Sequence, residues 1–67
     1  MMFRSVEKLY PSDFIKLNDE TFKVGDIQQQ GDGFTMAIIR IRESKPRFYL
    51  QIRRSDMIEV TMPIFST

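Results

Sequence analysis

The chain has 67 residues, a formal net charge of +1, and neither cysteine nor histidine. This length leaves room for a single domain, residues 1–67. The missing residue types exclude disulfides, thiolate metal sites, thiol nucleophiles and any catalytic triad that uses histidine. Since the sequence shows no catalytic or cofactor signature either, we expect a non-enzymatic protein that binds no cofactor.

The N-terminal segment Phe3–Leu9 fits two structures, because Phe3, Val6 and Leu9 form a helical stripe while an added edge strand suits the segment nearly as well. After it come short segments that alternate polar and apolar residues and are separated by closely spaced turn signals, a pattern typical of an all-β barrel or sandwich. The strands are expected at Phe14–Leu17, Thr21–Gln28, Phe34–Arg42, Arg47–Arg53 and Met57–Met62.

The third and fourth of these strands predict a hairpin. If Glu43–Pro46 forms a four-residue loop, Arg42 faces Arg47. One face then carries only apolar pairs, which are Ile41–Phe48, Ile39–Leu50 and Ala37–Ile52. The opposite face carries Arg40–Tyr49, Ile38–Gln51 and Met36–Arg53. Because a slip of one residue would exchange the two faces, the pattern fixes this register as long as the loop has four residues.

The flanking strands add inward residues in the same phase, except that Ile27 is out of phase with Phe22 and Val24. A β-bulge at Gly25 would restore the alternation and bend the strand. The expected inner set is Ile15, Leu17, Phe22, Val24, Ala37, Ile39, Ile41, Phe48, Leu50, Ile52, Ile58 and Val60.

These strands predict a small five-stranded antiparallel SH3-like barrel or roll, with an OB-like barrel as second choice and an extra N-terminal strand or helical turn. In strand spacing the arrangement resembles the SH3-like translation and KOW domains. No family motif accompanies this resemblance, so it implies no function.

A concentrated basic surface is the first candidate site. Residues 40–54 have a net charge of +5, and the rest of the chain has a net charge of −4. The predicted register gathers Arg40, Arg42, Arg47 and Arg53 around Tyr49 on the outward face of the hairpin. Guanidinium groups bind phosphates and an exposed aromatic ring stacks on bases, so this face suits RNA or single-stranded DNA. The same face could instead meet an acidic protein, or be a solvated surface neutralised by Glu43, Asp56 or Glu59.

An apolar surplus is the second candidate. The C-terminal segment Met62–Thr67, the N-terminal residues Met1–Phe3 and the outward Met36 and Ile38 predict a protein-interaction or regulatory subunit that self-associates as a homo-oligomer. The N-terminus lacks the apolar stretch of a signal peptide, and the longest apolar run, Met36–Ile39, is far shorter than the ~20 residues of a membrane helix. We therefore expect a cytoplasmic protein without membrane contact.

Overall fold

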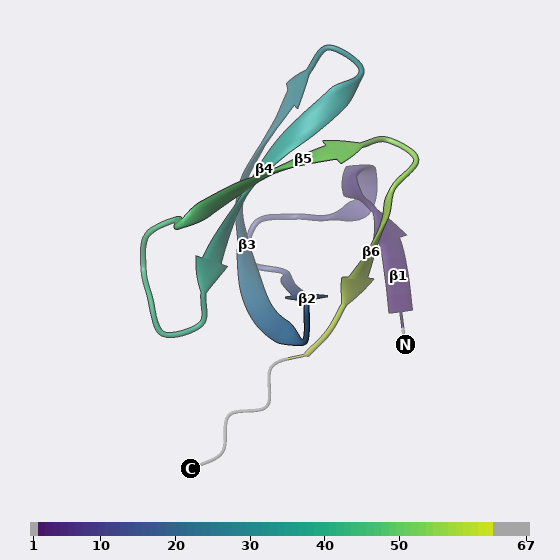
Figure 1. Cartoon of the computed structure of the whole chain (residues 1–67). Coiled ribbons are helices and arrows are strands. Elements are labelled where there is room, and N and C mark those ends of the chain that lie inside the picture. The colour runs from purple at the N-terminus through teal and green to yellow at the C-terminus, as the bar shows by residue number, and fades with distance from the viewer. Residues whose placement is uncertain (1, 63–67) are drawn as a thin grey trace.

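The computed structural model describes residues 2–62, which form one six-stranded antiparallel sheet and a single turn of 3-10 helix (Figure 1). The elements are β1 (Met2–Ser5), η1 (Val6–Lys8), β2 (Phe14–Leu17), β3 (Glu20–Gln30), β4 (Gly33–Arg40), β5 (Phe48–Arg53) and β6 (Met57–Val60). Their order across the sheet is β1-β6-β2-β3-β4-β5. The all-β prediction is confirmed, with six strands in place of five. The sheet is strongly curled but not closed, since β1 and β5 are its two edges.

The ambiguous N-terminal segment contains both expected structures in succession. β1 pairs antiparallel with β6 as an added edge strand, and η1 follows it directly. Val6 and Leu9, three residues apart, are both buried in the core. The helical spacing of these two residues therefore corresponds to a single turn, η1, which directs both side chains into the core.

The expected strands are all present, but only β2 has both predicted ends, since β3 is longer than expected and β4, β5 and β6 end or begin at other residues. β2 has the expected bounds, and the two residues that join it to β3, Asn18 and Asp19, have φ values of 51° and 64°. Two successive positive φ values are typical of a two-residue type I′ turn, for which Asn and Asp are suited. Gly31, in the turn between β3 and β4, also has a positive φ of 60°.

A β-bulge interrupts β3 at the predicted position. The pairing with β4 shifts register between Val24 and Ile27, which contains Gly25. A Cβ atom at Gly25 would lie 3.3 Å from Cβ of Ala37 and 3.4 Å from Cδ1 of Ile39, so a larger residue would crowd β4. The bulge lets β3 bend, and its two halves follow different directions in Figure 1.

The predicted register of the hairpin is wrong by three residues. Ile38 pairs with Phe48 instead of Gln51, and Met36 pairs with Leu50 instead of Arg53. The connection is the seven-residue segment 41–47, because a turn in which the amide of Glu43 donates to the carbonyl of Arg40 ends β4 early. A shift by an odd number of residues exchanges the faces of one strand relative to the other.

This shift changes which side chains of β4 face the core. Met36 and Ile38, expected on the outward face, belong to the core, and Ile41, expected inside, is exposed. Ala37 and Ile39 are buried, but on the opposite, convex face, where they pack over Gly25. On β5 the expected faces are right, although Phe48 lies at the rim and is partly exposed.

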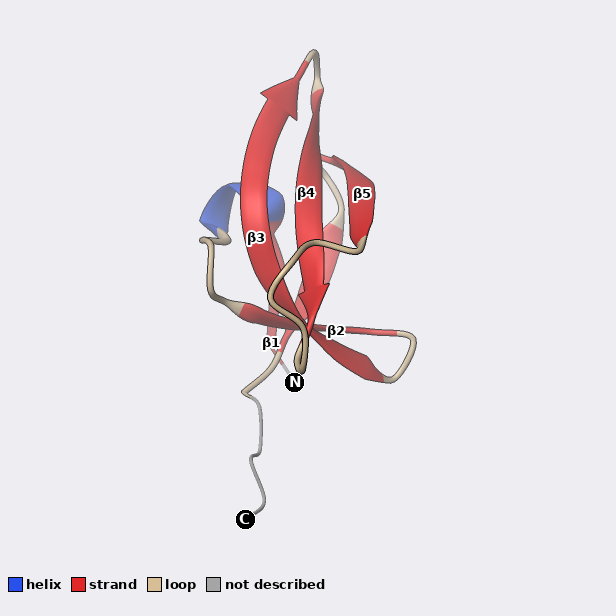
Figure 2. Ribbon diagram, turned by 90° about the vertical axis from the view of Figure 1, so that its left-hand side faces the viewer, coloured by secondary structure: helices blue, strands red, loops and turns tan. Residues whose placement is uncertain are grey.

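The core lies on the concave side of the curled sheet. Its buried members are Val6, Leu9, Ile15, Phe22, Val24, Met36, Ile38 and Ile52. Partly buried side chains pack against them, namely Leu17, Ile27, Phe34, Leu50, Ile58 and Val60. In Figure 2, β3 and β4 lie between η1 and β5. η1 therefore does not cover the part of the core beside β5.

The observed register makes a prediction about two isoleucines of the same hairpin. Ile38→Val removes a methylene from a fully buried side chain and should lower the free energy of unfolding by ~0.5–1.5 kcal/mol. Ile41→Val alters an exposed side chain and should change it by less than about 0.5 kcal/mol. Urea unfolding of both variants measures the difference. Equal losses of unfolding free energy, or a larger loss for Ile41→Val, would instead support the register expected from the sequence pattern.

Candidate functional site

The five residues expected on one basic face lie in three different places. Alternate residues of a strand point to opposite faces, so Tyr49 and Arg53 of β5 share the convex face, away from Leu50 and Ile52. Arg40 lies opposite Phe22 and is on the concave side. Arg42 and Arg47 belong to the loop between β4 and β5. The expectation of one shared face is therefore wrong, because it depended on the four-residue loop.

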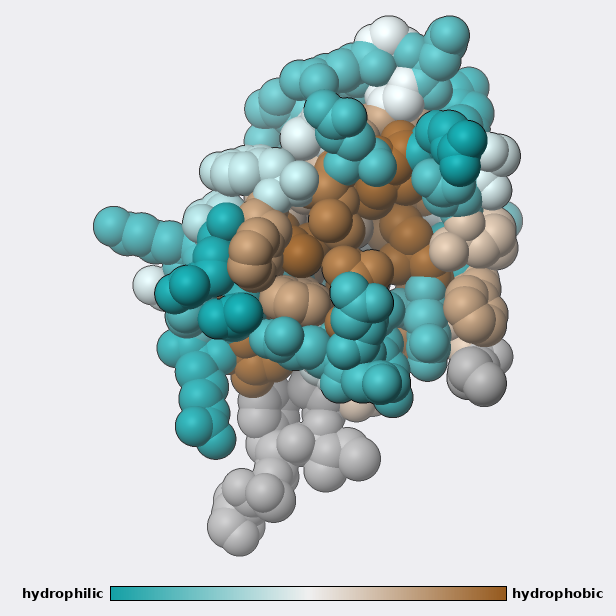
Figure 3. All heavy atoms as spheres, viewed as in Figure 1, coloured by the Kyte–Doolittle hydropathy of each residue, from teal (hydrophilic) through white to brown (hydrophobic). Residues whose placement is uncertain are grey.

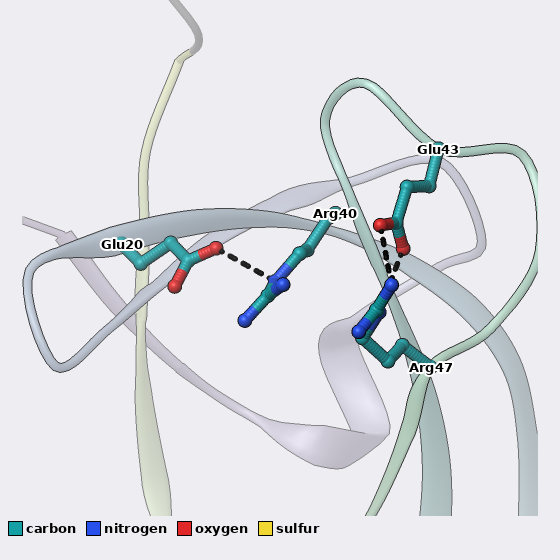
Figure 4. A network of polar contacts seen from close by, with 4 residues as sticks. All are labelled: Glu20, Arg40, Glu43 and Arg47. Carbon is teal, nitrogen blue, oxygen red and sulfur yellow. Dashed lines mark hydrogen bonds and ion pairs between the residues drawn. The ribbon is translucent and has the colours of Figure 1, made fainter.

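Most of these arginines are paired with acidic side chains of the same chain. Arg47 forms a two-pronged contact with Glu43, with nitrogen–oxygen distances of 3.0 Å each (Figure 4). Arg40 Nε lies 3.2 Å from Oε2 of Glu20. Two further pairs are Arg53–Asp56 at 3.5 Å and Arg54–Glu7 at 3.7 Å. All are at least partly exposed, so each contributes roughly 0–1 kcal/mol to stability, but together they reduce the positive field around residues 40–54.

Arg40 is held at the edge of an apolar surface. Its guanidinium carbon lies 5.5 Å from the centre of the Phe48 ring, in cation–π contact. The Phe48 ring in turn packs edge-on against Phe22, with 6.3 Å between ring centres. The Nε atom of Arg40 is shielded from solvent and has no aligned hydrogen-bond partner among residues 2–62, although Glu20 is close. Arg40 is thereby fixed over the aromatic pair and covers one end of the concave face.

A groove of about 380 Å³ opens beside this arginine on the concave side. Its apolar lining comes from four neighbouring strands and consists of Leu17, Phe22, Ile38, Phe48 and Leu50. The other lining residues are Asn18, Glu20, Arg40 and Tyr49, the last of which lies between Phe48 and Leu50 on β5 with its side chain directed to the convex face. Figure 3 shows hydrophobic surface at the centre of the molecule, surrounded by hydrophilic side chains. The curled sheet thus leaves part of its apolar side open, on the side that η1 does not cover.

The groove adjoins the free edge of the sheet. β5 is the last strand in the sheet order and pairs with β4 alone among the described strands. Phe48 and Leu50 of this strand line the groove, so its side chains and its free backbone edge lie together. Sequence analysis pointed to β5 because of its charges and missed the groove. The groove depends on residues of β2 and β3 that only the fold brings beside β5.

The apolar residues expected to mediate self-association are only partly accessible. Met36 and Ile38 are buried, so their expected role in a contact is wrong. Met2, Phe3 and Met62 are exposed. Met1 and Pro63–Thr67, the remainder of the two apolar ends, lie outside the described residues.

Within residues 2–62, no group of three or more acidic side chains is placed to hold a metal ion. No helix of the described chain is long and apolar enough to cross a membrane. The chain matches no protein-family model, and neither the characterised proteins nor the solved structures compared with it gave a match. The groove, the free edge of β5 and the charges around them are therefore the features of this structure that bear on function.

Proposed function

We propose that this protein is a non-enzymatic protein-interaction module that receives an extended segment of another polypeptide beside β5. The observation that carries the proposal is the apolar groove next to a free strand edge. A free edge offers a row of backbone donors and acceptors, which an added strand satisfies with its own main chain. The groove then receives alternate side chains of that strand.

The lining of the groove favours polypeptide over polyanion. Five of its nine residues are apolar, and its one arginine is engaged by Glu20 and Phe48. A phosphate chain would have to displace this ion pair and would meet apolar walls, whereas an extended peptide presents an apolar side chain at every second residue. The chemistry of the groove therefore fits a peptide with alternating apolar residues.

We also propose an SH3-like arrangement for strands β2 to β6, with an OB-like arrangement as the alternative. The order β6-β2-β3-β4-β5 supports it, because the last strand returns to pair with the first of the five through Ile15 and Val60. The bend of β3 at Gly25 lets the same strand pair with β2 at one end and with β4 over most of its length.

Peptide binding tests the proposal directly. A fluorescein-labelled peptide of about ten residues that alternates valine with threonine should bind, and a peptide of the same composition with valines at helical spacing should not. Phe48→Glu places a charge in the apolar wall and should weaken binding about tenfold or more, measured by fluorescence anisotropy.

Tyr10→Glu is the matched control, because it replaces an exposed aromatic residue with the same charge outside the groove. It should leave peptide affinity unchanged. Equal binding by wild type and Phe48→Glu, or no preference between the two peptides, would refute this function.

Nucleic-acid binding is the second candidate function. The surface available for it is smaller than the basic face expected from the sequence. Tyr49 is 66% exposed on the convex face that also carries Arg53. In the described loop between β4 and β5, Arg42 and Lys45 have no ion-pair partner. Together these residues offer a stacking ring and two unneutralised cations for RNA or single-stranded DNA.

Binding of a labelled oligouridylate tests this candidate. For a single strand, the slope of log affinity against log salt is about −0.7 per phosphate contacted, so Arg42→Ala with Lys45→Ala should make it shallower by about 1.4. Tyr49→Ala should weaken binding about fivefold or more through lost stacking. Absence of binding at low salt would remove the candidate.

A further inference from the structure

The central residues of β5 have none of the features that usually keep an edge strand from pairing. Proteins protect such edges with lysine, proline, inward charges or short length. β5 is six residues long, and Phe48–Ile52 contains neither charge nor proline. The opposite edge, β1, has only four residues and includes Arg4. β5 is therefore the described edge that is better suited to accept another strand.

We infer that the polypeptide received by β5 is β5 of a second copy of this chain, paired antiparallel about a twofold axis at Leu50. This inference rests on the function proposed above and names the partner of the same site. A twofold axis places the same strand on both sides of the interface, so one surface serves both copies. The concave faces of the two sheets then lie on the same side and form one continuous apolar surface.

The side chains of β5 match this register. If residues of the concave face are to lie opposite each other, the twofold axis must pass through a residue and not between two residues. With the axis at Leu50, every uncharged residue of Phe48–Ile52 lies opposite another uncharged residue. On the concave face, Phe48 meets Ile52 of the second copy and the two Leu50 side chains meet each other. Aromatic and branched residues are favourable cross-strand pairs. On the convex face, Tyr49 meets Gln51.

The charges at the ends of the strand are also compatible. This register places Arg47 opposite Arg53 of the second copy, a repulsive contact if the arginines were alone. Arg47 already binds Glu43, and Arg53 already binds Asp56. Each end of the interface therefore contains two cations and two anions, so the charges that meet there are balanced. With a net charge of only +1, two whole chains repel each other weakly.

Sedimentation velocity over about 1 to 500 µM measures the inferred dimer. Wild type should shift from monomer to dimer as concentration rises. Tyr49→Glu with Gln51→Glu brings like charges together twice in the interface and should raise the dimer dissociation constant about tenfold or more. Both side chains are exposed on the convex face, so this double variant should fold, which circular dichroism verifies.

A charge swap makes the register itself testable. Tyr49→Lys with Gln51→Glu places the new lysine opposite the new glutamate of the second copy, and should restore dimerisation to within about threefold of wild type. Tyr10→Glu with Gln28→Glu is the matched control, since it changes the same residue types to acids at exposed positions away from β5. It should dimerise as wild type does.

Dimerisation of the Tyr49→Glu, Gln51→Glu variant at wild-type strength would overturn the inference, and so would failure of the charge swap to restore it. A wild type that stays monomeric throughout would also overturn it. If that monomer binds the alternating peptide, the protein-interaction function stands and only the identity of the partner is wrong. If it binds neither, both are refuted.

Discussion

The pairing of β4 with β5 determines what the rest of this molecule can do. It is set by the turn in which the amide of Glu43 donates to Arg40, since that bond ends β4 and leaves seven residues to reach β5. The pairing puts Met36 and Ile38 into the core and places Arg40 over Phe48. It also leaves Phe48 and Leu50 as one wall of an open groove. The composition of the core, the distribution of charge and the position of the groove all depend on the end of β4 at Arg40.

Structural features that are set by residues adjacent in the sequence could be predicted from the sequence. The bounds of β2 and the bulge at Gly25 follow from turn residues and from a break in a two-residue period. The register of β4 and β5 could not be predicted, because Met36–Ile39 is apolar at four consecutive positions and suits either face. β4 in fact buries both faces there, with Ala37 and Ile39 over Gly25.

Two residues that line the groove, Arg40 and Tyr49, were singled out from the sequence, but its apolar lining was not. The pairs Arg40–Glu20 and Arg54–Glu7 join residues far apart in sequence, so only the fold shows that these cations are neutralised. The groove has the same origin, because Leu17 and Phe22 reach β5 through the curl of the sheet. Residues 2–62 contain one helical turn to cover the core, and β3 and β4 separate that turn, η1, from β5. Part of the apolar concave face remains open because so little helical structure is present to cover it.

The ion pairs of these arginines also affect the rate at which this protein would associate with a partner. Fast association, above about 10⁷ M⁻¹s⁻¹, generally needs a strong field of one sign that steers the partner inward. Here Glu7, Glu20, Glu43 and Asp56 each offset one arginine at a distance below 4 Å, which weakens that field. Encounter with an uncharged strand edge is then governed by diffusion and orientation, and its rate depends little on ionic strength. A complex formed as proposed would therefore owe its selectivity to its lifetime, which the contacts made in the groove would determine.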